Sequence, residues 1–246
     1  MSLPLPTLVR APDAAALCWA AAEEVEHRAK EAVAARGAFT LALSGGSTPR
    51  ALYELLADPT RPFRGRMPWT AVHAFFGDER AVPPDHPQSN YRMASEALLA
   101  RVPLASVHRI EGERGAEEAA ARYEEDLQRH FGAAAVPVFD LVLLGLGTDG
   151  HTASLFPGSP VLQERIRWVA ASRGPPPVAE RVTLTLPVLG AARAAVFLVS
   201  GRDKAGPLRR LLRPSPDENI PAARVHAVTS MVLADSAAAA DLDPRP

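Results

Sequence analysis

Short apolar runs of strand length recur along the chain, separated by segments in which apolar residues return at helical spacing. The runs lie at residues 39–44, 71–76, 138–147, 166–172, 181–186 and 194–200, and weaker strand signals fall near 225–233. The run VFDLVLLGLG at 138–147 is so apolar that we expect both faces of its strand to be buried, as in a parallel sheet.

Helices are predicted between these strands, over residues 13–36, 48–58, 90–102, 115–132 and 201–212, with an alanine-rich helix at the end of the chain. Asp13 can cap the first helix, and Gly37 follows its end. Thr48 is placed to cap the second helix, with Pro49 at its first position. Strands that alternate with helices predict an α/β fold: a mostly parallel, Rossmann-like sheet flanked by helices.

The proline-rich segment RGPPPV at 173–178 lies between two predicted strands. Because regular elements continue on both sides of it, we interpret it as a surface loop rather than a linker. The chain has 246 residues, enough for one large domain or two small ones, and no internal repeat divides it. We therefore expect residues 1–246 to form a single domain.

Composition and charge narrow the classes of function. The net charge is −1 with no long run of one sign, so neither nucleic acid nor a membrane surface is expected as a partner. The N-terminal residues lack the pattern of a signal peptide. The single cysteine, Cys18, cannot form an internal disulfide, and we interpret it as a buried apolar residue of the first helix. We expect a cytoplasmic protein that binds a small molecule. The sequence does not determine the oligomeric state, and a monomer is compatible with it.

Polar or glycine-rich loops follow four of the predicted strands, after residues 44, 76, 147 and 200. They read SGGST, GDER, TDGH and GRDK. In open α/β sheets, ligands bind beyond the carboxyl ends of the strands. We therefore expect these four loops to meet at one ligand site.

The loop GLGTDGHTASLFPG contains a match to the dinucleotide-binding pattern at Gly145, Gly147 and Gly150. That pattern requires a helix that opens within the glycine run, and an acidic residue about 20 positions later. Pro157 and Gly158 interrupt any helix here, and the residues around 170 carry no acid. The sequence therefore argues against a nicotinamide cofactor.

The segment LALSGGSTPRALYELL is a better candidate for binding phosphate. Gly45 and Gly46 allow the backbone to approach a ligand, the helix that follows favours an anion, and Ser47 and Thr48 add hydroxyl donors. A plain strand-to-helix turn remains the alternative. Arg80 and Lys204 follow two other strands, and two such cations beside the loop suit a phosphate monoester, although either alone also fits a solvated surface charge.

His151 has three possible roles: a hydrogen-bonded structural histidine, a metal ligand or a general base. The seven histidines show no zinc-binding spacing, and there is no G-x-S-x-G motif for a serine nucleophile. A base that activates water, oriented by Asp149, stays open beside the structural role.

Taken together, five motifs resemble those of the 6-phosphogluconolactonase family. They read LALSGGSTP, FFGDERAVPPDHPQSNY, DLVLLGLGTDGHTASLFPG, RVTLTLPVL and FLVSGRDKA. The resemblance extends from about residue 10 to the predicted last helix. It implies a fold related to glucosamine-6-phosphate isomerase/deaminase. It also implies hydrolysis of 6-phospho-D-glucono-1,5-lactone to 6-phosphogluconate in the oxidative pentose phosphate pathway, with no metal and no organic cofactor.

The resemblance also implies roles for individual residues. His151 is expected to act as the general base with Asp149 beside it, and Asp78, Asn90 and Arg181 are expected to contact substrate. The phosphate site is expected to comprise Gly45, Gly46, Ser47, Thr48, Arg80 and Lys204.

Two alternatives remain at this stage. One is the isomerase/deaminase of the same superfamily. That enzyme carries an acidic residue five positions after the histidine, where this chain has Phe156. Its loop also reads D-E-Y, where this chain has Arg80 in place of the tyrosine. The other is a non-catalytic sugar-phosphate sensor. A regulator of that kind would need a DNA-binding segment, for which residues 1–36 provide at most one helix and no basic cluster.

Overall fold

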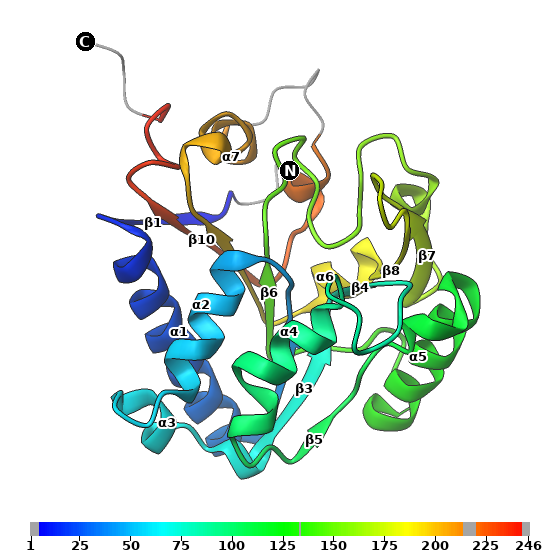
Figure 1. Cartoon of the computed structure of the whole chain (residues 1–246), viewed down its shortest axis with the longest axis horizontal. Helices are drawn as coiled ribbons and strands as arrows, with labels where there is room; N and C mark the ends of the chain where they lie inside the picture. The colour runs from blue at the N-terminus through cyan, green and yellow to red at the C-terminus, as the bar shows by residue number, and fades with distance from the viewer. Residues whose placement is uncertain (1–4, 133, 214–219, 243–246) are drawn as a thin grey trace.

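The structure is a computed structural model, described over residues 5–132, 134–213 and 220–242. Its centre is a sheet of seven parallel strands in the order β1-β10-β9-β6-β2-β3-β5 (Figure 1). The mostly parallel sheet predicted from the sequence is therefore confirmed. The strands are β1 (Thr7–Ala11), β2 (Phe39–Leu43), β3 (Val72–Phe76), β5 (Ser106–Val107), β6 (Leu141–Leu144), β9 (Ala194–Val199) and β10 (Thr229–Asp235).

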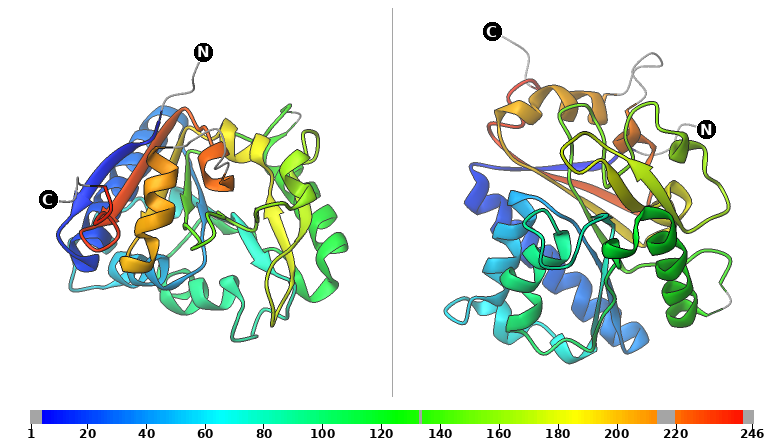
Figure 2. Two further views of the ribbon diagram at one scale, coloured as in Figure 1. Left: turned by 90° about the horizontal axis from the view of Figure 1, so that it is seen from above. Right: turned by 45° about the vertical axis from the view of Figure 1, so that its right-hand side comes forward.

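A second, antiparallel sheet stands beside the first, in the order β4-β8-β7. Its strands are β4 (Asp78–Arg80), β7 (Val169–Arg173) and β8 (Glu180–Leu184). The segments predicted as strands at 166–172 and 181–186 belong to this small sheet and pair with each other. Helix α5 (Ala116–Phe131) packs against β7 and β8, on the side of the molecule opposite to α1 (Ala14–Arg36), as the two views of Figure 2 show.

Helix α1 packs against α2 (Ser47–Ala57) and against strands β1, β2 and β10. The side chain of Asp13 accepts a hydrogen bond from the Ala16 N–H, and Gly37 ends the helix in the left-handed conformation at φ 78°, so both predicted caps are confirmed. Cys18 is buried on this helix, as predicted, and burial raises the pKa of its thiol. The remaining helices are α3 (Pro62–Arg66), α4 (Asn90–Ala97), α6 (Leu186–Ala191) and α7 (Ala205–Leu212).

The central strands are apolar because they have no face in contact with water. Every residue of β2, β6 and β9 is buried. Strands covered on both faces cannot show alternating polarity, which is why the run at 138–147 reads as continuously apolar. The apolar core extends from these strands into the helices on either side.

The strand order reverses between β2 and β6. From β2 the chain proceeds to β3 and β5 on one side, and β6 then begins the other side, followed by β9 and β10. Such a reversal leaves a crevice at the carboxyl ends of the two strands, where α/β proteins bind ligands. The loops that follow β2 and β6 are the SGGST and TDGH loops identified in the sequence.

Several elements differ from the prediction. Helix α2 begins at Ser47 rather than after Thr48, because Gly46 at φ 109° already turns the chain into the helix. The alanine-rich terminal helix is absent from the described residues: after Asp235 the chain up to Leu242 forms turns. Strands β1, β4 and β5 and the short helices α3 and α6 were not predicted. Among the described residues, no helix is long and apolar enough to cross a membrane.

Candidate active site

A cavity of about 390 Å³ opens at the carboxyl ends of β2, β3, β6 and β9. It contains side chains or backbone from all four loops that the sequence singled out. Ten of the eleven predicted site residues line it: Gly45, Gly46, Ser47, Thr48, Asp78, Arg80, Asn90, His151, Arg181 and Lys204. The eleventh, Asp149, contacts His151.

The loop after β2 presents unpaired backbone donors to the cavity. Since the first helical hydrogen bond runs from the Arg50 N–H to the Gly46 carbonyl, the N–H groups of Ser47 and Thr48 have no partner within α2. Pro49, also in the first turn, has no N–H to leave unpaired. The positive end of the helix dipole adds to these donors, so this end of α2 favours an anion.

Gly45 is required by the close approach of Asn90. A Cβ atom on Gly45 would lie 2.0 Å from Asn90 Oδ1, which no side chain can tolerate. The amide of Asn90 in turn donates to the Asp78 carbonyl oxygen at 2.9 Å. The SGGST loop therefore contacts the start of α4, which is hydrogen-bonded to β4.

Two arginines lie side by side on neighbouring strands of the small sheet. Arg80 on β4 is paired in register with Arg181 on β8. Arg181 is only 8% exposed, and its Nη1 atom is buried without a hydrogen-bond partner among the described residues. Desolvation, and then the like charge of Arg80, lower the pKa of the Arg181 guanidinium. An anion bound beside the pair would satisfy the free donor and offset the repulsion.

Glu79 holds the loop that carries Arg80, a role the sequence analysis did not assign. Its carboxylate, 2% exposed, accepts hydrogen bonds from the backbone N–H groups of Arg80, Asn90 and Tyr91 and from the Ser89 hydroxyl. Burial raises the pKa of Glu79, while these four donors stabilise the charged form. Its position inside the D-E-R motif, between two predicted site residues, is the sequence signal that could have found it.

Asp78 is a positioning residue as well as a lining residue. Its Oδ2 atom accepts a hydrogen bond from the Ser154 hydroxyl at 2.6 Å. Ser154 belongs to the loop after β6, three residues beyond His151. Asp78 therefore fixes the histidine loop against the small sheet, and Ser154 is a second residue that sequence reasoning missed.

Lys204 enters the cavity from the loop after β9. Its ammonium lies 3.1 Å from the Asp203 carboxylate, and its side chain is 25% exposed. Asp235, at the end of β10, accepts hydrogen bonds from the Ser200 hydroxyl and the Gly201 N–H, which ties this loop to the neighbouring strand. The position of Lys204 is thus set by the pairing of β9 with β10.

His151 and Asp149 form a hydrogen-bonded pair at the end of β6. The Nδ1 atom of His151 lies 2.6 Å from Asp149 Oδ1, which also accepts the His151 backbone N–H at 3.0 Å. Desolvation opposes ionisation of Asp149, but the bonds from His151 outweigh it and lower the pKa of the carboxyl. A carboxylate on Nδ1 leaves Nε2 as the basic nitrogen of the ring, the arrangement a general base requires.

Phe156 packs against the catalytic candidate, with its ring centroid 4.6 Å from that of His151. The β7–β8 loop covers it: a Cβ on Gly174 would lie 2.6 Å from the Phe156 ring, and Pro175 lines the cavity. The segment 173–178 is therefore a hairpin connection between β7 and β8 that forms part of the cavity wall.

Comparison with known proteins places the chain in a family. The model of glucosamine-6-phosphate isomerases/6-phosphogluconolactonase matches residues 12–233. A 6-phosphogluconolactonase of Synechocystis sp. is 44% identical over 200 residues, 78% of this chain and 79% of the relative. A solved 6-phosphogluconolactonase from Trypanosoma cruzi matches with TM-score 0.85 and 31% identity over 99% of each chain. A monomeric glucosamine-6-phosphate deaminase shares the fold, with TM-score 0.76 and 22% identity over 96% of this chain and 99% of its own. The chain thus belongs to the glucosamine-6-phosphate isomerase/6-phosphogluconolactonase family, as its motifs predicted.

Proposed function

We propose that the protein hydrolyses 6-phospho-D-glucono-1,5-lactone to 6-phosphogluconate, with His151 as the general base. The observation that carries the proposal is one cavity in which a histidine–aspartate pair faces an anion site made of two helix N–H groups, Arg80 and Lys204. The names of the relatives that match at 40–44% identity support this activity.

In the proposed mechanism, the anion site binds the phosphate and so orients the lactone ring. His151 Nε2 removes a proton from a water molecule as its oxygen attacks the C1 carbonyl. The resulting oxyanion needs a hydrogen-bond donor. We assign this role to Arg181, whose Nη1 atom is buried and has no hydrogen-bond partner among the described residues. His151 then returns the proton to the ring oxygen as the C1–O bond breaks, which yields the open acid.

Phe156 favours this reaction over deamination of an amino-sugar phosphate. Isomerisation of an aldose to a ketose requires a proton-exchanging group that opens the sugar ring, in addition to a base near C2. The residue packed against His151 is a phenyl ring, which cannot exchange protons. Lactone hydrolysis needs only water, one base and a held substrate, all of which this cavity can supply.

The experiment that tests the proposal is hydrolysis of freshly prepared lactone by the purified protein in excess EDTA. We expect the same rate with and without the chelator. Among the described residues, the one group of three or more histidine, cysteine or acidic side chains close enough to hold a metal shares no residue with the cavity lining. A rate that falls to the uncatalysed background and returns on adding zinc would contradict a metal-free base.

Removal of either phosphate-site cation is expected to weaken binding of 6-phosphogluconate by about 2 kcal/mol, or roughly 30-fold. The variants are Arg80→Ala and Lys204→Ala, measured by calorimetric titration with the product. Arg167→Ala, which removes an equally charged but 63% exposed side chain outside the cavity, is the matched control. Wild-type affinity in both cavity variants would rule out their assignment to the phosphate.

A further inference from the structure

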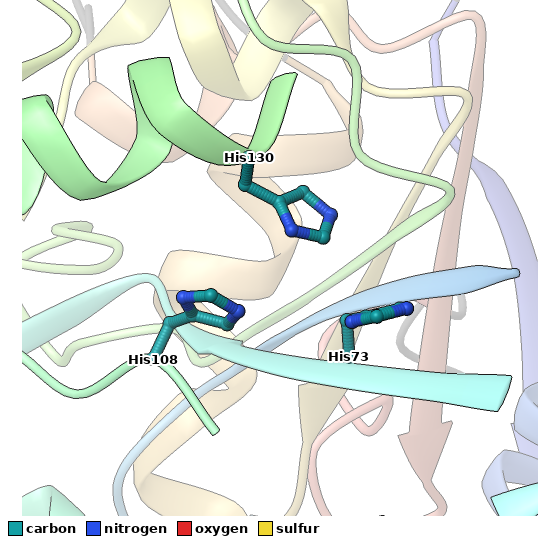
Figure 3. A group of neighbouring side chains, drawn as sticks. All are labelled: His73, His108 and His130. Carbon is teal, nitrogen blue, oxygen red and sulfur yellow. The ribbon is translucent and has the colours of Figure 1, made fainter. Parts of the chain in front are cut away.

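Three histidines far apart in the sequence meet at the edge of the central sheet. His73 lies on β3, His108 directly follows β5, and His130 is in the last turn of α5 (Figure 3). One ring nitrogen of each lies within 4.8 Å of those of the other two. None of the three lines the cavity at the strand ends, so the cluster is separate from the active site.

We propose that His73, His108 and His130 bind one Zn²⁺ ion, which ties α5 to the edge strands β3 and β5. Neutral imidazole is a preferred nitrogen ligand of zinc, and three protein ligands leave the fourth tetrahedral position to water. At Zn–N distances of about 2.0–2.1 Å, tetrahedral ligand atoms stand roughly 3.3 Å apart. The nitrogens thus need to approach by about 1.5 Å at most, a movement that side-chain rotation can provide.

The surroundings of His108 prepare it as a ligand. Its Nδ1 atom lies 2.7 Å from the Asp126 carboxylate, so the proton stays on Nδ1 and the lone pair on Nε2. A carboxylate on the far nitrogen is the usual outer partner of a metal-binding histidine. Asp126 and His130 are separated by one turn of α5, so this helix presents both the outer carboxylate and a ligand on the same face. The Phe75 ring, stacked at 4.2 Å, fixes the plane of the His108 imidazole.

Ser106 lies between two of the proposed ligands. Its hydroxyl lies 2.7 Å from His108 Nε2 and 2.8 Å from His73 Nδ1, between the two rings. His130 closes the group from the helix side, its ring centroid 4.8 Å from that of His73 and 5.2 Å from that of His108. Desolvation, and then neighbouring imidazoles, lower the pKa of His73 and His130.

The test is a titration of the full-length, EDTA-stripped protein with Co²⁺ and Zn²⁺. We expect one ion per chain, visible absorption bands of tetrahedral Co²⁺ that Zn²⁺ displaces, and a melting temperature about 5 °C or more higher at a hundredfold excess of Zn²⁺ over its dissociation constant. His73→Asn and His130→Asn should abolish the Co²⁺ bands. Asp126→Asn, which keeps all three ligands, should weaken affinity about 10–100-fold.

Two control variants locate the ion. His27→Gln removes an exposed histidine on α1, and His151→Ala removes the histidine of the cavity; both should bind Co²⁺ and Zn²⁺ like the wild type. His130→Asn should hydrolyse the lactone at the wild-type rate, because the ion lies outside the cavity. The proposal would be overturned by the absence of a zinc-dependent rise in melting temperature. Binding that survives in His73→Asn and His130→Asn but disappears in His151→Ala would overturn it as well.

Discussion

Replacement of His151 by alanine is expected to lower the turnover of 6-phosphogluconolactone by about 10²–10⁴-fold, the usual contribution of a general base. The variant keeps the helix N–H groups, Arg80 and Lys204, so it should bind 6-phosphogluconate with wild-type affinity. Turnover is measured with saturating lactone and corrected for spontaneous hydrolysis. A loss of turnover with unchanged product affinity separates a role in chemistry from a role in binding.

Asp149→Asn serves as the graded comparison for this variant. The amide oxygen can still accept the Nδ1 proton of His151 but carries no charge, so the ring stays oriented and the imidazolium that forms is less stabilised. We expect a smaller loss than for His151→Ala. A His151→Ala protein with near-normal turnover would exclude the histidine as the base.

A single methyl group on Gly147 is expected to lower turnover by about 10²-fold or more, without removing any catalytic atom. A Cβ at this position would lie 2.1 Å from His151 Nδ1 and 2.7 Å from Asp149 Oδ1. The histidine must therefore move and lose its bond to the aspartate, and a displacement of about 1 Å can cost 10²-fold in rate. The backbone of Gly147 is not in the left-handed region, so Gly147→Ala adds no conformational strain.

Gly65→Ala is the matched control, because a Cβ at Gly65 meets no atom within 4 Å and the residue lies on α3, outside the cavity. Both variants should melt like the wild type, since the Gly147 methyl displaces only the side chains of His151 and Asp149, which are 31% and 47% exposed. If Gly147→Ala turns over the lactone as fast as Gly65→Ala, the bond between His151 and Asp149 has no part in catalysis.

The central sheet was predictable because its strands have no solvent-exposed face. In a chain where strands and helices alternate, a short, continuous apolar run such as Leu141–Leu144 indicates a strand buried on both faces. The edge strands were not predictable: β5 has two residues, and β1 is mostly exposed, so neither produces an apolar run. The three-residue β4 consists of Asp78, Glu79 and Arg80, which are polar because they build the site.

The site, like the sheet, was predictable only where a local sequence pattern marks it. The loops were found because parallel strands bring their carboxyl ends to one edge, so local motifs were enough to collect eight residues around one cavity. Asn90 and Arg181 lie outside these loops and were expected only from the family resemblance. The positioning contacts of Glu79 and Ser154 depend on the small antiparallel sheet, which no local pattern announced. The prediction that Thr48 caps α2 was wrong because the cap is Gly46, at positive φ, and the helix starts two residues earlier, at Ser47.

The histidine cluster illustrates a limit of motif reasoning. The spacing of the histidines gave no sign of this cluster, because His73, His108 and His130 are brought together by the pairing of β3 with β5 and by the end of α5. Histidines this far apart in the sequence match no metal-binding motif. Only the fold reveals them.

The most direct test of the account is a side-by-side assay of the purified protein on 6-phosphogluconolactone and on glucosamine 6-phosphate, in the same buffer with EDTA. Phosphate recognition is common to both substrates, so the comparison depends only on the chemistry next to the bound ring. With Phe156 against His151 and no proton-exchanging group in its place, we expect rapid consumption of the lactone and no detectable release of ammonia. Ammonia release without acceleration of lactone hydrolysis would contradict the account.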